Sequence, residues 1–297
     1  MAEKDKIVRM TLMDGEVSVL ASRTTQLVDE AKKIHDLTNV CTAALGRTLT
    51  AAAMMCCGMK RDADSMTAVI RGDGPIGGIV VSGDGALRLR GYVYHPRADV
   101  PNKAEGKLDV GGVVGNGTLM VLKDLGLKEP YSGQVDLVSG EIAEDFAQYF
   151  ALSEQQRNAV SLGVLVKEDV LGAGGVIVAP MPGCGEALLQ EVQDRIGEFY
   201  GISSMLSRGE QPEEIVERVF RPLRPKLLDQ RFPVYSCNCS QERLEQVILS
   251  MGAQEIRDMI DQDGGAEVHC HFCNQIFQFS GGQLEALLER ATSGEPM

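Results

Sequence analysis

Four cysteines near the end of the sequence constrain this chain more than any other feature. They form two close pairs, Cys237-Asn238-Cys239 and Cys270-His271-Phe272-Cys273, separated by the thirty residues 240–269. Four thiolates in two close pairs are the ligand set of a tetrahedral Zn²⁺ ion. The spacing therefore predicts a C-terminal segment that folds around one zinc ion held by Cys237, Cys239, Cys270 and Cys273.

Other uses of these cysteines are less consistent with their surroundings. Four buried cysteines without a metal fit poorly in a polar, acidic segment, although cysteine is often buried. A thioredoxin-like C-x-x-C needs an adjoining βαβ unit, and here strand-like residues flank the motif. His269 or His271 could replace one thiolate, but four sulfurs already complete the tetrahedron. We expect both histidines to be exposed strand residues, and Cys41, Cys56 and Cys57 to lie in the core.

Composition limits the cellular setting and the partners. The first ten residues, MAEKDKIVRM, lack the apolar stretch of a signal peptide, and we find no run of about 18 apolar residues. We therefore expect a cytoplasmic protein without a membrane segment, whose thiols are kept reduced. The net charge of −13 argues against a nucleic-acid partner, and residues 237–297 carry ten acidic residues against three arginines.

Hydrophobic periodicity divides the chain into three expected parts. Residues 1–180 predict a Gly-rich α+β core domain, because short β-type runs and turn dipeptides alternate with a few helical patterns. Residues 181–236 predict a charged helical linker that has no core of its own. Residues 237–297 predict a small Cys₄ zinc domain with two helices, a β-hairpin and a last helix.

Several individual elements follow from local patterns. KIVRMTL and VSVLASR predict a hairpin with an Asp-Gly turn. Thr24 or Thr25 is expected to cap a helix that precedes a second helix over 39–59. Further predictions are a strand at 134–138 and helices over 140–152, 185–207, 212–221, 240–250, 253–261 and from 283, with a hairpin over 266–279.

The C-x-C pair favours a switch over a permanent staple. A disulfide joining Cys237 to Cys239 would close a small, strained ring, and strained disulfides are the labile kind. Structural zinc supplies about 10–16 kcal/mol of apparent folding energy in small domains, which exceeds the stability expected of a sixty-residue unit. Oxidation of the thiolates is therefore expected to release the ion, unfold the segment and remove support from the linker.

The cysteine pattern, the 32.1 kDa mass and the order of the parts resemble the heat-shock protein 33 family, the redox-regulated 33-kDa chaperonins. The resemblance implies an inactive, zinc-bound, reduced monomer. It also implies that oxidative stress pairs Cys237 with Cys239 and Cys270 with Cys273, releases zinc and unfolds the linker. The oxidised protein, commonly a homodimer, would then hold unfolding client proteins without ATP.

Client binding has one candidate surface in the sequence. Leu188, Val192, Ile196 and Phe199 recur at helical spacing, and we hypothesise that this stripe is hidden in the reduced state and binds clients after zinc loss. A stripe at this spacing is more often permanent core. The rival functions are an enzyme, for which no nucleotide-binding, metalloprotease or serine-hydrolase motif occurs, and a zinc-stabilised structural or nucleic-acid-binding module.

Overall fold

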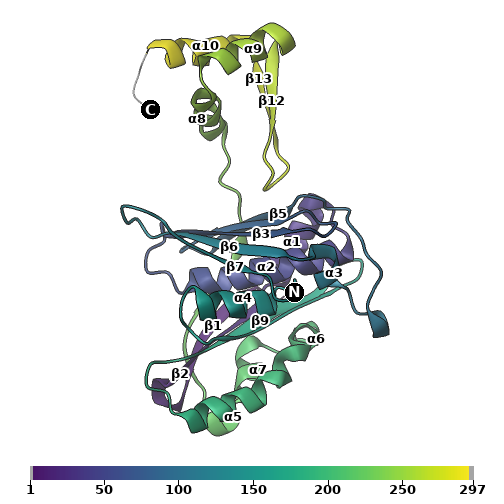
Figure 1. Cartoon of the computed structure of the whole chain (residues 1–297), viewed down its shortest axis with the longest axis vertical. Helices are drawn as coiled ribbons and strands as arrows, with labels where there is room; N and C mark the ends of the chain where they lie inside the picture. The colour runs from purple at the N-terminus through teal and green to yellow at the C-terminus, as the bar shows by residue number, and fades with distance from the viewer. Residues whose placement is uncertain (1–2, 294–297) are drawn as a thin grey trace. The chain divides into compact units, whose positions relative to one another are not determined.

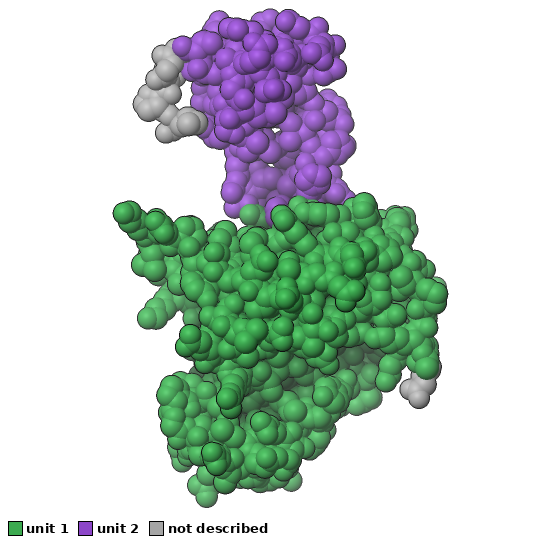
Figure 2. Space-filling view, viewed as in Figure 1, with its two compact units in different colours: residues 1–236 green, residues 237–297 purple. Residues whose placement is uncertain are grey.

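The computed structural model describes residues 3–293. The chain forms two units, residues 1–236 and 237–297, which are coloured separately in Figure 2. The segment 181–236, expected to be a linker, lies within the first unit.

Two sheets and their connecting helices build the first unit, as the α+β prediction requires. The five-stranded sheet has the order β10-β1-β2-β9-β8, with bounds Lys226–Arg231, Lys6–Leu12, Val17–Arg23, Val170–Pro180 and Ala159–Val166. The six-stranded sheet has the order β11-β5-β4-β3-β6-β7, with bounds Val234–Tyr235, Arg88–Val93, Ile79–Asp84, Ser65–Gly72, Gly117–Asp124 and Tyr131–Asp136. The predicted N-terminal hairpin is confirmed as β1 and β2, with a 3₁₀ turn at Met13–Gly15.

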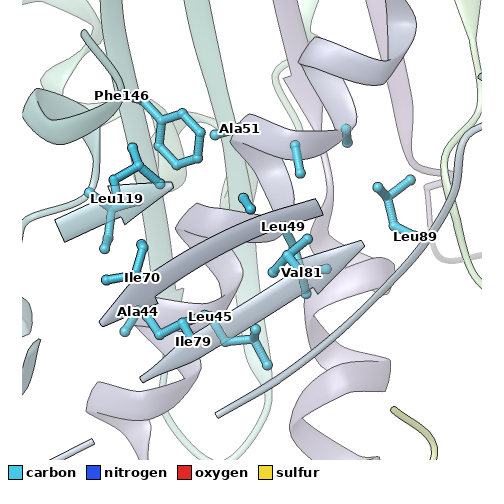
Figure 3. Close-up of a cluster of buried hydrophobic side chains, with 14 of the residues drawn as sticks. Ala44, Leu45, Leu49, Ala51, Ile70, Ile79, Val81, Leu89, Leu119 and Phe146 are labelled. Atoms are coloured by element: carbon cyan, nitrogen blue, oxygen red, sulfur yellow. The ribbon is translucent and has the colours of Figure 1, made fainter. Parts of the chain in front are cut away.

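The helix α2 (Asn39–Cys57) lies between the two sheets (Figure 1) and contacts strands of both. Figure 3 shows its side chains Leu45 and Leu49 among those of β3, β4 and β5. Cys41, Cys56 and Cys57 are buried in this helix, as expected. Among residues 3–293, α2 is the one helix long and apolar enough to cross a membrane, and 89% of its apolar window is buried inside the fold.

The helix α1 (Thr25–His35) is capped differently from the prediction. Thr24 occupies the N-cap position, but its hydroxyl is hydrogen-bonded to the hydroxyl of Thr50 (2.6 Å). The carboxylate of Asp5 instead accepts hydrogen bonds from the backbone N–H groups of Gln26 and Leu27 (3.0 and 2.7 Å). The cap therefore comes from a residue that precedes β1, which local sequence patterns do not reveal.

A third helical group covers the outer face of the five-stranded sheet. It comprises α5 (Glu186–Ile196), a 3₁₀ turn (Gly197–Gly201), α6 (Ile202–Ser207) and α7 (Pro212–Val219). The prediction of one helix over 185–207 is wrong at this turn, because two glycines, which are poor helix formers, bound it. Val192 and Phe199 are buried, whereas Leu188 and Ile196 pack partly buried against the same core.

Two strands and several short elements complete the first unit. The strands β10 and β11 follow the helix-breaking RPLRPK sequence; β10 pairs with β1, and β11 pairs in parallel with β5. Neither strand was predicted. The remaining elements are α3 (Val110–Val114), α4 (Ala143–Leu152) and 3₁₀ turns at Ala104–Gly106 and Arg221–Leu223.

The second unit has the predicted order of elements. It contains α8 (Gln241–Met251), α9 (Ala253–Asp263), the antiparallel hairpin of β12 (Gly265–His269) and β13 (Ile276–Ser280), and α10 (Gly281–Ser293). Its buried hydrophobic core is small and consists of Ile248, Ile256, Phe279, Leu284 and Leu287. A core of this size stabilises a sixty-residue unit only weakly, so the unit needs a further source of stability.

Candidate metal centre

The turn between β12 and β13 positions one cysteine pair. The N–H of Cys270 donates to the carbonyl of Gln275 (2.9 Å), and the N–H groups of Cys273 and Asn274 donate to the carbonyl of Cys270 (3.3 and 2.8 Å). Asn274 has φ of +56°, a left-handed conformation that asparagine tolerates better than most residues. These bonds close a tight loop that holds Cys270 and Cys273 close together.

The other pair lies in the extended segment that leads into α8. Ser240 caps this helix, because its hydroxyl accepts a hydrogen bond from the N–H of Arg243 (3.3 Å). The cap fixes where the helix begins and holds Cys237 and Cys239 in extended backbone before it. Hairpin and helix start thus present two sulfurs each.

The four sulfurs converge. All four lie within 4.8 Å of one another, and all four cysteines are partly buried. Cys237 Sγ is 3.6 Å from Cys270 Sγ, and Cys239 Sγ is 3.4 Å from Cys273 Sγ. A tetrahedral ion with metal–sulfur bonds of about 2.3 Å would separate its sulfurs by about 3.8 Å. The cluster therefore has the size and donor set that one metal ion of this kind requires.

The electrostatics of the cluster also favour a bound cation. Burial, with added hydrogen bonds from Cys273 and the other two thiols, raises the pKa of Cys239 well above its usual range. Burial likewise raises the pKa of Cys273. Burial opposes ionisation at Cys270 as well, yet backbone and thiol hydrogen bonds lower the pKa of Cys270. Neighbouring thiolates at these distances repel one another, and a bound divalent cation would offset that repulsion.

The histidines lie outside this cluster. His269 Nε2 is 2.8 Å from Glu267 Oε1, and both His269 and His271 are exposed. His269 ends β12, as expected, whereas His271 lies in the turn and not in a strand. Within residues 3–293, the group that could hold a metal ion is the four cysteines alone.

Two residues that shape the cysteine loop were not predicted. Asn274 supplies the left-handed position, and the side-chain oxygen of Gln275 lies 3.8 Å from Cys239 Sγ. The Cys-Asn dipeptide at 273–274 could have indicated the turn, because asparagine is enriched at left-handed positions. The contact of Gln275 with Cys239 joins segments far apart in sequence and has no local signal.

Comparison with known proteins identifies the relatives of this chain. Residues 5–280 match the Hsp33 protein family. The chain belongs to the Hsp33 family. A 33 kDa chaperonin from Acetivibrio thermocellus is 46% identical over 288 residues, covering 96% of this chain and 97% of the relative. A 33 kDa chaperonin from Shouchella clausii is 45% identical over 293 residues, covering 98% of this chain and 99% of the relative.

A solved Hsp33 structure has the same fold. The 33 kDa chaperonin (heat shock protein 33 homolog) of Thermotoga maritima superposes with a TM-score of 0.89 at 34% identity, covering 98% of this chain and 100% of that one. The resemblance stated from the cysteine pattern is thereby confirmed. Because the relatives are named chaperonins, a non-enzymatic function, the expectation that the chain is not an enzyme is also confirmed. Chaperone membership implies binding of unfolded client proteins.

Proposed function

We propose that this protein is a redox-regulated, ATP-independent holdase of the cytoplasm that prevents aggregation during oxidative stress. In the reduced form, Cys237, Cys239, Cys270 and Cys273 would hold one Zn²⁺ and the protein would be an inactive monomer. In the oxidised form it would be a homodimer that binds unfolding clients. The observation that carries the proposal is the convergence of four sulfurs in a unit with a very small core.

The chemistry of the switch follows from the thiols. Bound zinc keeps the sulfurs deprotonated and cross-links the hairpin to the start of α8. We expect disulfides Cys237–Cys239 and Cys270–Cys273, each formed when two thiolates give two electrons to an oxidant such as peroxide, which is reduced to water. A sulfur in a disulfide is no longer a thiolate ligand, so both pairs lose their hold on the ion. The hairpin and α8 then lose the cross-link that fixed them together.

The apolar stripe supplies a surface that release would expose. Val192 and Phe199 are 4% and 0% exposed, and they pack with Leu188 and Ile196 against the outer face of the five-stranded sheet. We propose that this stripe contacts clients once the linker has unfolded. Its present burial fits an inactive reduced state, since a buried apolar surface cannot bind a partner.

One experiment tests the switch. Purified reduced protein is treated with peroxide at raised temperature while zinc release and suppression of the thermal aggregation of a model protein are followed together. We expect both signals to rise together. Zinc release without suppression of aggregation would leave a structural zinc protein and overturn the holdase proposal.

A second experiment tests the stripe. Leu188→Ser with Ile196→Ser alters two partly buried members, and Gln190→Ser with Gln193→Ser alters two exposed positions of the same helix as a control. We expect only the first pair to weaken aggregation suppression by the oxidised protein. Equal activity of the two double variants would exclude the stripe as the client surface.

A further inference from the structure

The strand β10 is attached to the first unit mainly through its backbone. Five of its six residues are exposed and the sixth is partly buried, so β10 contributes almost nothing to the core. Leu227 and Leu228 are 46% and 51% exposed. Its register with β1 also shifts between Arg9 and Met10. Main-chain pairing with little side-chain burial makes β10 one of the more weakly held parts of the sheet.

Features of β10 oppose pairing with a further strand. Pro225 and Pro233 flank it, and Lys226, Asp229 and Arg231 give it charged side chains. Prolines, charges and register irregularities are the means by which proteins keep an edge strand from recruiting another chain. The strand β10 therefore protects the edge of the five-stranded sheet.

The adjacent strand β1 lacks the prolines and the irregular register of β10. Its Val8, Met10 and Leu12 are buried in a core that includes Ile215 and Val216 of α7, so release of the segment would also uncover these side chains. The strand β1 pairs along its whole length with β2, which would hold it in place without β10. Loss of β10 would thus leave an intact, straight edge with unpaired N–H and C=O groups.

Two ion pairs hold the covering segment over β1. Lys6 Nζ is 2.6 Å from Glu213 Oε1 of α7, and Arg9 Nε is 3.7 Å from Asp229 Oδ2 of β10. Both acidic partners belong to the segment that the proposed switch releases, and both basic partners belong to β1. Departure of the segment therefore leaves a basic edge on a chain whose net charge is −13.

We infer that β10 is a removable edge cover, and that the uncovered β1 binds an extended, acidic segment of an unfolding client as an added strand. The inference rests on the proposed function, because it requires release of residues 212–231. Main-chain hydrogen bonds recognise any extended chain, which suits a holdase with varied clients. Lys6 and Arg9 favour client segments with acidic side chains over a second copy of this acidic protein.

Hydrogen exchange at β1 tests the inference. In oxidised protein, the amides of Lys6–Leu12 that point toward β2 are expected to stay protected, whereas those that point toward β10 should exchange about tenfold faster or more than in reduced protein. An alternating acidic peptide, acetyl-(Glu-Val)₄-amide, should restore their protection, and the lysine counterpart (Lys-Val)₄ should do so far less. The amides of β8, which forms the opposite edge of the same sheet, serve as the internal control and should not respond to either peptide.

Three outcomes of the hydrogen-exchange experiment would overturn the inference. They are continued protection of β1 after zinc release, no restoration by the acidic peptide, and restoration by raised protein concentration alone, which would identify a second copy as the occupant.

A locked variant, Arg9→Cys with Asp229→Cys, joins facing positions of β1 and β10 by a disulfide. After oxidation, the locked variant should release zinc normally but should not bind the acidic peptide. Each single variant is the control and should bind the peptide. Peptide binding by the locked variant would contradict the inference. Failure of the wild type to release zinc or suppress aggregation would instead refute the proposed function.

Discussion

The two units of this protein are stabilised in different ways. In the first, α2 and two sheets bury a large, continuous set of side chains, so stability is distributed over many residues. In the second, five buried residues form the core, and four sulfurs lie together at one end of the hairpin. A substitution at one position of the first unit removes only a small share of its stability. A chemical change at the sulfur cluster can destabilise the whole second unit. A chain can thus combine a stable platform with a part that responds to its chemical surroundings.

Metal removal should reveal this difference most strongly. A chelator that strips the reduced protein is expected to unfold the second unit, with a loss of about 10 kcal/mol in apparent stability. Amide signals of the β12–β13 hairpin should collapse while those of the β3–β4 pair persist. Cys273→Ser should act in the same direction and Cys184→Ser, outside the cluster, should not. An unchanged hairpin after chelation would show that the small core suffices.

A core truncation should have the converse effect. Phe146 of α4 is fully buried in the first unit, and Phe146→Ala is expected to reduce its free energy of unfolding by about 3–5 kcal/mol. Denaturant unfolding should show this loss without a change in zinc affinity of the second unit. Leu127→Ala, at a side chain 71% exposed, is the control. Weaker zinc binding in Phe146→Ala would show that the units are not independent.

The first unit should also have a pH dependence of its own. Burial raises the pKa of Asp5 from 3.8 to about 6, against the hydrogen bonds from Leu27 and Gln26. The folded state therefore holds a proton that the unfolded state has lost between these values, and stability should rise as pH falls from 7 to 4, by up to about 3 kcal/mol. Denaturant titrations at several pH values measure this, and Asp5→Asn should flatten the profile. A stability that falls over this range in the wild type but not in Asp5→Asn would contradict the assignment.

A smaller loss of stability is expected from a substitution at Tyr235, near the C-terminal end of the first unit. The hydroxyl of Tyr235 donates to the carbonyl of Gly91 (3.0 Å) and lies 3.2 Å from His35 Nε2. Tyr235→Phe should destabilise the attachment of β11 by about 1 kcal/mol. Faster exchange of the Val234 and Ser236 amides, which donate to Leu87 and Leu89, would report it. Tyr131→Phe, whose hydroxyl donates to Ser153 at an exposed site, should leave these amides unchanged.

Local patterns predicted much of the fold and the sulfur cluster. The hairpin of β1 and β2, the helix α2 and the elements of the second unit follow from periodicity, turn residues and glycines, which act over a few positions. The four cysteines could be grouped from spacing alone, because few other ligand sets have two close sulfur pairs. Their convergence within 4.8 Å agrees with that grouping.

Features that depend on distant partners could not be predicted. The sequence KLLDQR has no alternation of apolar and polar residues, so no local pattern predicts a strand there. The segment is a strand because its backbone pairs with that of β1. Asp5 caps α1 from the far side of a hairpin. The two glycines of Gly197–Gly201 could have indicated the end of α5. The apolar residues keep their helical spacing across this turn, however, and so predicted one continuous helix.

The position of α2 has a consequence for survival under stress. Because 89% of its apolar window is buried inside the fold and it contacts strands of both sheets, separation of either sheet would expose apolar side chains of this nineteen-residue helix to water. Partial opening around α2 is therefore costly, and α2 should unfold together with the strands that precede residue 181, whereas the proposed switch releases only the segment after them. A protein that must keep its own shape while its neighbours lose theirs gains from such all-or-none behaviour.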